Sequence, residues 1–201
     1  MDQYRVTNEN ESYVVEASSK NGARKEVLKK EGITVEKVEF EDVGDTTGEW
    51  IFLEQDDPRW ADEKIGKTSF TIGAYGCLIT DLSMLSYWYG GFFTPEEIAK
   101  KANFTNKGYY IWSSGDLFLP FDFEYRYYNR DIEKIKSILF SDDNAVVVRV
   151  SAYGAYHWLA VIGYDQVSKE LLGADPLTGD RVFIESKYGK INGFAEVKRN
   201  K

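Results

Sequence analysis

The only cysteine of this 201-residue chain stands where a glycine-marked turn gives way to an apolar helical pattern. Gly76 precedes Cys77, and from Leu78 the apolar residues recur at the spacing of a helix that is buried on one side. A thiol in the first turn of a helix faces unpaired backbone N–H groups and the positive end of the helix dipole, and both favour the thiolate. We therefore interpret Cys77 as a nucleophile.

Helical patterns dominate the middle of the chain, and strand patterns dominate its end. Thr94 with Pro95 predicts a capped helix that ends near Ala102, and a further short helix is expected from Asp131 through Phe140. An aromatic strand or extended stretch is expected at residues 118–128, and four apolar segments have strand character at 145–150, 157–164, 171–175 and 181–184. Helices followed by an antiparallel meander predict an α+β domain rather than a doubly wound one.

Residues 1–45 are expected to form a small α/β appendage of βαβ type, and residues 46–201 the main domain. The appendage would contain strands at 4–7, 12–16 and 34–40, a helix at 19–31 and a linker at 44–48. We interpret it as a possible docking module for a protein partner. The alternative is that its basic helix face is only a solvated surface.

The composition restricts the classes of function. A net charge of −8 and a pI near 4.9 argue against a nucleic-acid partner and favour basic or neutral substrates. With 1 Cys and 1 His, an internal disulfide is excluded, a zinc site of the usual kind is unexpected, and no cofactor is implied. No stretch approaches the roughly 18 apolar residues of a membrane span. The first residues, Met1–Arg5, lack the basic and then apolar run of a secretory signal, so we expect a cytoplasmic protein as synthesised, with export and virion association left open.

The segment around the single histidine carries a geometric expectation. The turn at residues 165–169 lies between two strand segments, and a hairpin folded about position 166 pairs His157 with Asp175. The two side chains would then share one face of the sheet, within reach for a carboxylate to orient an imidazole. A slip of one residue in the register would place them on opposite faces.

Cysteine chemistry needs a base for the thiol, a group that orients the base and a donor for the developing oxyanion. His157 and Asp175 are candidates for the first two roles, and Gln55, in a polar loop upstream of Cys77, is suited to the third. Each residue also has a structural reading. A lone cysteine is most often a small buried hydrophobe, Asp175 could cap a turn, and Gln55 could bond within its loop.

These residues belong to larger blocks, namely Gln55–Trp60, Ile72–Thr80 with Met84, Tyr89–Gly90 with Thr94–Pro95, His157–Asp165 and Ala174–Pro176. In this order the blocks resemble the C39-like cysteine peptidases of bacteria and their phages, over residues from about 50 to 185. The resemblance implies a papain-like fold, with the cysteine on a central helix and the histidine and aspartate on the facing sheet. It also implies the roles of nucleophile, general base and acid, orienting residue and oxyanion donor for Cys77, His157, Asp175 and Gln55.

The chain departs from some members of that family at Leu78 and Ile79, where glycine or proline is common, so the shape of the adjacent cleft is in question. Trp112 and Tyr156 are our candidates for substrate contact, with core packing an equal alternative. The leading hypothesis is a metal-independent peptidase that forms a thioester. The alternatives are an amidase or endopeptidase of peptidoglycan peptides, and a peptide-binding module that keeps the fold without turnover.

Overall fold

The computed structural model describes residues 2–7, 12–17, 40–42, 50–141 and 143–200. Near the N-terminus, β1 (Asp2–Thr7) pairs antiparallel with β2 (Ser12–Ala17), which confirms the two strands expected there. The expected helix at 19–31 and linker at 44–48 lie outside the described residues, as does most of the expected strand at 34–40. β3 (Phe40–Asp42) pairs with a strand of the main sheet.

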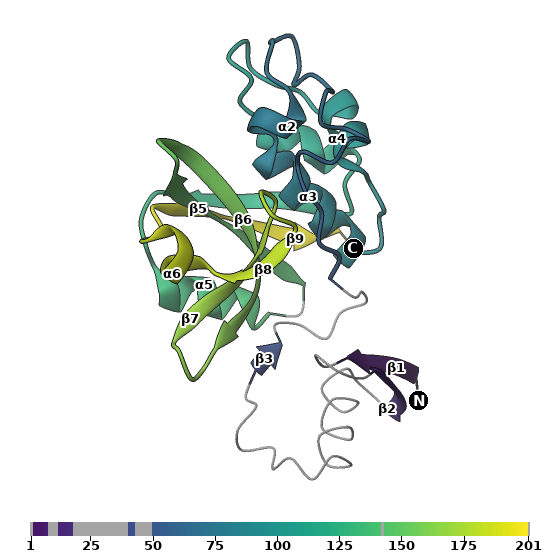
Figure 1. Cartoon of the computed structure of the whole chain (residues 1–201), viewed down its shortest axis with the longest axis vertical. Coiled ribbons are helices and arrows are strands. Elements are labelled where there is room, and N and C mark those ends of the chain that lie inside the picture. Colours follow the sequence, from purple (N-terminus) through teal and green to yellow (C-terminus); the bar gives the residue numbers. More distant parts are fainter. Residues whose placement is uncertain (1, 8–11, 18–39, 43–49, 142, 201) are drawn as a thin grey trace.

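The main sheet is antiparallel and has the strand order β4-β9-β5-β6-β7-β8, with β3 beside β6 (Figure 1). Its strands are β4 (Phe121–Tyr127), β5 (Asn144–Ala152), β6 (Ala155–Asp165), β7 (Glu170–Asp175), β8 (Asp180–Phe183) and β9 (Gly193–Arg199). The meander from β5 to β8 confirms the prediction. The sequence analysis missed β9, which lies between β4 and β5.

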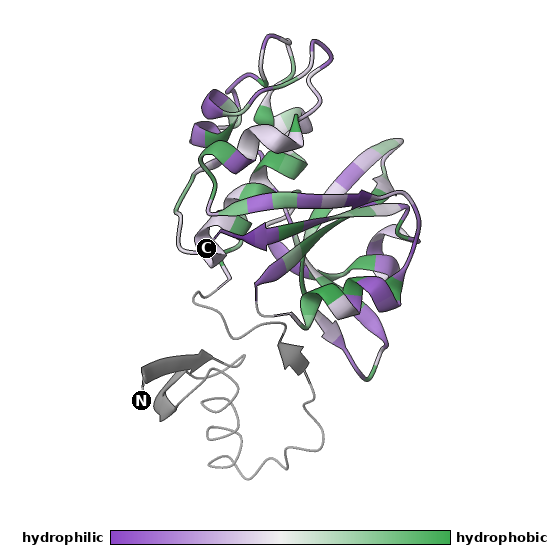
Figure 2. Cartoon of the chain, turned by 180° about the vertical axis from the view of Figure 1, so that it is seen from behind, coloured by the Kyte–Doolittle hydropathy of each residue, from purple (hydrophilic) through white to green (hydrophobic). Residues whose placement is uncertain are grey.

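Helices cover both faces of this sheet. They are α2 (Ile72–Tyr75), α3 (Cys77–Trp88), α4 (Pro95–Lys101), α5 (Ile132–Leu139) and α6 (Ile184–Tyr188), with a 3₁₀ helix η2 at Trp112–Leu117. One hydrophobic cluster joins α3 and α4 to one face of the sheet, and a second joins α5 and α6 to the other. Hydrophobic residues follow the central strands and the helices that face them (Figure 2). The α+β prediction is confirmed, with a central helix on an antiparallel sheet as in the papain-like fold.

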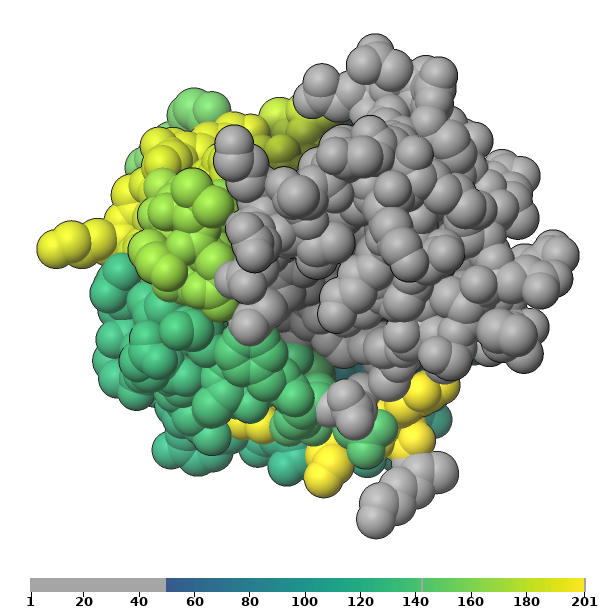
Figure 3. All heavy atoms as spheres, turned by 90° about the horizontal axis from the view of Figure 1, so that it is seen from below, coloured from purple at the N-terminus to yellow at the C-terminus, as the bar shows by residue number. Residues whose placement is uncertain are grey.

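The second cluster joins residues of α5 and α6 to the face of the sheet opposite α3. In Figure 3 the residues around α5, in teal, border the yellow-green residues of the later strands. Lys136 of α5 lies 4.7 Å from the ring centroid of Tyr164 on β6, so the helix is held against the end of that strand. This layer supports the sheet from the side opposite α3.

The helix that begins at Cys77 is buried almost all round. The sequence pattern predicted burial on one side, but polar positions such as Asp81, Ser83 and Ser86 are buried as well as the apolar ones. They tolerate burial because they have internal partners: the Ser83 hydroxyl donates to the Phe93 carbonyl at 2.6 Å, and the Ser86 hydroxyl donates to Ser83 at 2.8 Å. The one-sided prediction was therefore wrong, and α3 is the centre of the fold.

The local signals for the other helices are confirmed. Thr94 and Glu97 form a reciprocal capping box at the start of α4, with bonds of 3.2 Å and 2.9 Å. Asp131 caps α5 by accepting a bond from the backbone N–H of Lys134 at 2.9 Å.

The register between β6 and β7 differs from the predicted one. Near the turn, Asp165 pairs with Glu170 and Gly163 with Leu172, but beyond Ile162 the register shifts by one residue. Ala160 then pairs with Ala174, so the continued ladder places Asp175 opposite Leu159 rather than opposite His157. His157 and Asp175 are thus diagonal neighbours on the same face, and the expected direct pairing was wrong.

We expect the packing of α3 to dominate the stability of this domain. Leu85 is 0% exposed in the centre of α3, so Leu85→Ala should lower the free energy of unfolding by about 3 kcal/mol. Leu117→Ala is the matched control, because Leu117 is 82% exposed and the change should cost less than about 0.5 kcal/mol. Urea unfolding of the two variants would measure both values. Similar losses for both leucines would contradict this assignment of the core.

Candidate active site

Cys77 is the first residue of α3, directly after the N-cap residue Gly76. A side chain at position 76 would not fit, because a Cβ atom there would lie 2.5 Å from both the carbonyl oxygen and the Cγ2 atom of Ile72. Glycine lets α2 and α3 follow one another closely, with Gly76 N–H donating to the Ile72 carbonyl at 2.7 Å. The glycine before the cysteine is therefore a packing requirement that fixes where the thiol begins the helix.

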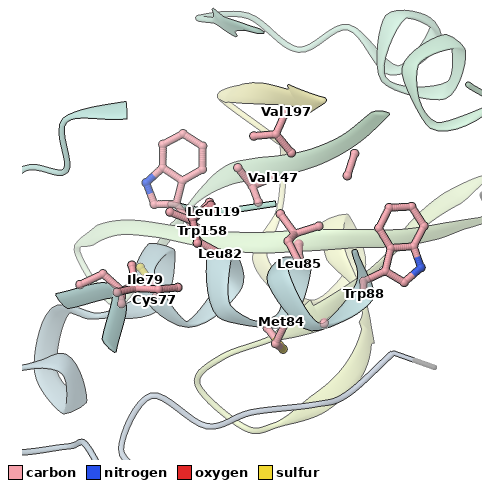
Figure 4. Close-up of a cluster of buried hydrophobic side chains, with 14 of the residues drawn as sticks. Cys77, Ile79, Leu82, Met84, Leu85, Trp88, Leu119, Val147, Trp158 and Val197 are labelled. Carbon is pink, nitrogen blue, oxygen red and sulfur yellow. The ribbon is translucent and has the colours of Figure 1, made fainter. Parts of the chain in front are cut away.

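The thiol of Cys77 is buried. The residue is 9% exposed and belongs to the same hydrophobic cluster as Trp158, and both lie at the end of α3 opposite Trp88 (Figure 4). Burial raises the pKa of Cys77 to about 12, and the carboxyl of Asp81 adds to the rise. Backbone N–H groups of Trp158, Leu78 and Cys77 itself act in the opposite direction but do not compensate.

The helix N-terminus was expected to favour the thiolate, and in the structure burial outweighs that effect. The resting thiol is therefore neutral near pH 7. Thiolate formation then requires a base that takes the proton during the reaction.

His157 and Asp175 form a buried pair. Nε2 of His157 lies 3.0 Å from Oδ1 of Asp175, and the two side chains are 5% and 0% exposed. The ring of Tyr188 packs edge-on against the imidazole, with 5.1 Å between the ring centroids. Because Nε2 faces an acceptor, a neutral imidazole carries its proton there, and Nδ1 is the nitrogen left to accept one.

Asp175 has two further side-chain partners, and sequence reasoning missed both. Lys187 Nζ lies 2.7 Å from Oδ2 and the Tyr188 hydroxyl donates to the same oxygen at 2.6 Å, while the Leu177 N–H donates to Oδ1 at 3.0 Å. Burial raises the pKa of Asp175, but the bonds from His157, Lys187, Tyr188 and Leu177 outweigh burial and hold the pKa well below its ordinary value. Asp175 is therefore a carboxylate. A five-residue helix with no motif supplies Lys187 and Tyr188, so no sequence signal could have found them.

A third residue that was not predicted, Asp81, links α3 to the strand that carries His157. Oδ1 of Asp81, one turn after Cys77, accepts a bond from the backbone N–H of Ala160 at 3.0 Å. Asp81 is 0% exposed, its Oδ2 atom has no hydrogen-bond partner among the described residues, and burial raises its pKa well above the ordinary value. The bond fixes the start of α3 against β6 near His157. The sequence signal that could have identified Asp81 was a charged residue within an otherwise apolar helical pattern.

Gln55 is 3% exposed and joins the loops that precede Cys77 and follow Asp175. Its Nε2 donates to the Gly73 carbonyl at 2.8 Å, and its backbone N–H donates to the Pro176 carbonyl at 2.7 Å. The bond to Gly73 fixes the orientation of the amide, because only the nitrogen end can donate. One amide hydrogen is used in that bond, and Oε1 has no hydrogen-bond partner within the part of the chain that the structure describes. The segments of Gln55, Cys77 and Asp175 are thus brought together.

The two aromatic candidates differ in their surroundings. Trp112 is half-buried at the start of η2 and packs edge-on against Trp158, with 5.7 Å between the ring centroids. Tyr156 is 65% exposed and lies beneath the Arg149 guanidinium, whose Cζ atom is 4.3 Å from the ring centroid. Trp112 therefore contributes to core packing, whereas Tyr156 is available at the surface.

Within the described ranges, no group of three or more His, Cys, Asp or Glu side chains is placed to hold a metal ion. Likewise, none of the helices in those ranges is long and apolar enough to cross a membrane.

The model of the Peptidase_C39 like family matches residues 52–197, which include Gln55, Cys77, His157 and Asp175. No curated protein matched the chain.

Among solved structures, the chain is similar to the peptidase domain of Streptococcus ComA, a bi-functional ABC transporter involved in a quorum sensing pathway. The match covers 76% of this chain and 100% of that one, at 14% sequence identity and a TM-score of 0.49. So distant a likeness does not bear on activity or substrate. The family match extends over most of the chain, and on that ground the chain belongs to the Peptidase_C39 like family.

Proposed function

We propose that this protein is a cysteine peptidase with Cys77 as nucleophile, His157 as general base and acid, and Asp175 as the orienting residue. The observation that carries the proposal is the buried contact of 3.0 Å between His157 Nε2 and Asp175 Oδ1, on a strand whose next residue, Trp158, acts on the Cys77 thiol through its backbone N–H. Membership of a peptidase family supports the same reaction class.

The reaction begins with proton transfer, because the resting thiol has a pKa of about 12. Nδ1 of His157 accepts the proton from Cys77 Sγ, and the thiolate attacks the carbonyl carbon of the scissile peptide bond. The C–N bond then breaks, the leaving amine takes the proton from His157, and the acyl group remains on Sγ as a thioester. His157 next deprotonates a water molecule, which attacks the thioester and releases the acid and the thiol.

Asp175 and Gln55 support different stages of this sequence. The carboxylate of Asp175 accepts a hydrogen bond from the Nε2–H group of His157 and stabilises the positive charge on the imidazolium. The second amide hydrogen of Gln55 would donate to the oxyanion of the tetrahedral intermediate, together with the Cys77 backbone N–H at the start of α3. Both roles require side chains with a fixed orientation. Lys187 and Tyr188 hold the Asp175 carboxylate, and the Gly73 carbonyl holds the Gln55 amide.

A second candidate function is a peptide-binding module that keeps the fold without turnover. The burial of Cys77 and its raised pKa favour this reading, because a reactive thiol is usually exposed and has a lowered pKa. Within the enzyme reading, peptidoglycan peptides remain the alternative to protein substrates.

The direct test of the peptidase proposal is hydrolysis by the wild type and by Cys77→Ala. Each is incubated with an unfolded protein and with purified peptidoglycan, and the products are identified by mass spectrometry. We expect the wild type to cleave one of the two substrates and Cys77→Ala to lose at least about a thousandfold in rate, because the covalent step is removed. Leu117→Ala serves as the surface control with unchanged rate. Equal cleavage by wild type and Cys77→Ala would refute the role of the thiol.

The alkylation rate of Cys77 separates the enzyme from the binding module. Iodoacetamide labels a single site, because the chain has 1 Cys. If His157 takes the thiol proton, His157→Ala should slow labelling at pH 7 by at least about tenfold, as measured by the mass increase over time.

The His157→Ala variant is expected to fold, because Lys187 and Tyr188 still hold the Asp175 carboxylate, and its circular dichroism spectrum would check this. Labelling at the same rate in both proteins would favour the binding module instead.

A further inference from the structure

We propose that Arg126, Arg149 and Trp158 form a subsite for a carboxylate group of the peptide substrate, next to the thiol of Cys77. The proposal rests on the proposed peptidase function and adds a substrate class to it.

Both guanidinium groups lie near one indole ring. The Cζ atom of Arg126 is 5.2 Å from the ring centroid of Trp158, and the Cζ atom of Arg149 is 6.0 Å from the same centroid. Each arginine also lies near a tyrosine, with Arg126 at 5.1 Å from the Tyr128 ring and Arg149 at 4.3 Å from the Tyr156 ring. Stacking on aromatic faces orients both arginines without using their hydrogen-bond donors.

The indole connects these arginines to the candidate active site. Trp158 follows His157 on β6, pairs with Arg149 across the sheet and packs in the same cluster as Cys77. Its own backbone N–H acts on the Cys77 thiol. Figure 4 shows Trp158 and Cys77 at the same end of α3. A ligand group between the two guanidinium groups would therefore belong to a peptide whose reacting carbonyl is close by.

Neither arginine is neutralised within the part of the chain that the structure describes. Arg59 and Arg130 have carboxylate partners at 2.7 Å and 2.6 Å, whereas no carboxylate of the described residues lies within ion-pair distance of Arg126 or Arg149. Arg149 donates to the side chain and backbone oxygens of Asn192 at 2.6 Å and 3.0 Å, which holds its position without cancelling its charge.

Both arginines are only half exposed, and each lies in the positive field of the other. Two such cations near one ring are costly when water is partly excluded, and a bound anion removes that cost. The planar forks of two arginines match the geometry of a carboxylate.

The ligand class is therefore a peptide with an aspartate or glutamate side chain, or with a free C-terminal carboxylate, near the scissile bond. The net charge of −8 by itself predicted basic or neutral substrates. A local pair of arginines instead selects an anionic group at one position.

The first test compares two alkylating reagents on Cys77. Iodoacetate and iodoacetamide both form the Sγ–CH₂ bond and release iodide, and they differ in a carboxylate against a neutral amide. The ratio of their rate constants cancels the reactivity of the thiol itself, so it does not require peptidase activity. We expect Arg126→Gln and Arg149→Gln each to lower the iodoacetate-to-iodoacetamide ratio by about fivefold, because one nearby positive charge is lost.

Arg199→Gln is the matched control for this ratio. Arg199 also lies near an aromatic ring, with its Cζ atom 6.0 Å from Tyr89, but Tyr89 follows the far end of α3. Arg199→Gln should leave the iodoacetate-to-iodoacetamide ratio at its wild-type value. Arg126→Lys keeps the positive charge, so it should retain most of the wild-type preference for iodoacetate. Arg149→Gln also removes the bonds to Asn192, so Arg126→Gln decides the result if the former fails to fold. An unchanged ratio in Arg126→Gln would overturn the subsite.

A second arm identifies the source of the carboxylate. Pools of randomised octapeptides are offered in two matched pairs, one with a fixed Glu against Gln and one with a free C-terminal acid against the amide. Faster cleavage of the Glu pool supports an acidic side chain, faster cleavage of the free acid supports the terminal carboxylate, and equal cleavage within both pairs overturns the proposal. If no pool is cleaved, the peptidase function fails, and the alkylation ratio alone decides the subsite.

Discussion

The contact between His157 and Asp175 depends on one extra residue in β6. Near the turn, the ladder pairs Gly163 with Leu172, and that register alone would place Asp175 opposite Ala160, on the face of the sheet away from His157. The shift at Ile162 moves the pairing by one residue and returns both side chains to one face. The bond of 3.0 Å between Nε2 and Oδ1 follows from this irregularity. The bulge is therefore a structural requirement of the candidate site.

Burial raises the pKa of both the Cys77 thiol and the Asp175 carboxyl, and their other contacts decide the outcome. Desolvation raises the pKa of Cys77 to about 12 and keeps the thiol neutral, because the Asp81 carboxyl adds to the rise and the nearby backbone N–H groups do not offset it. Asp175 is ionised, because His157, Lys187, Tyr188 and the Leu177 N–H stabilise the carboxylate more than burial disfavours it. In the resting site the negative charge is therefore on Asp175, and the proton to be transferred is on the Cys77 thiol. Transfer of that proton to His157 is the step on which the proposed chemistry depends.

Much of this arrangement could be predicted from the sequence. The single cysteine at a glycine turn, the single histidine in a strand and the capping residues of α4 and α5 are local signals, and the structure places them as local rules require. The sequence correctly predicted that the side chains of His157 and Asp175 share one face of the β6–β7 hairpin. The predicted register was wrong, because no pattern in the sequence marks a bulge at Ile162.

The remaining features depend on tertiary contacts. Lys187 and Tyr188 approach Asp175 only because α6 folds back against the sheet, and the burial of the thiol results from packing between α3 and Trp158.

Nuclear magnetic resonance of the ring nitrogens of His157, the only histidine, tests the central claim most directly. We expect the ring proton that faces Asp175 to be on Nε2, with a downfield-shifted proton signal that is lost in Asp175→Ala. A proton on Nδ1 alone, or a ring that exchanges freely between the two tautomers, would contradict this assignment.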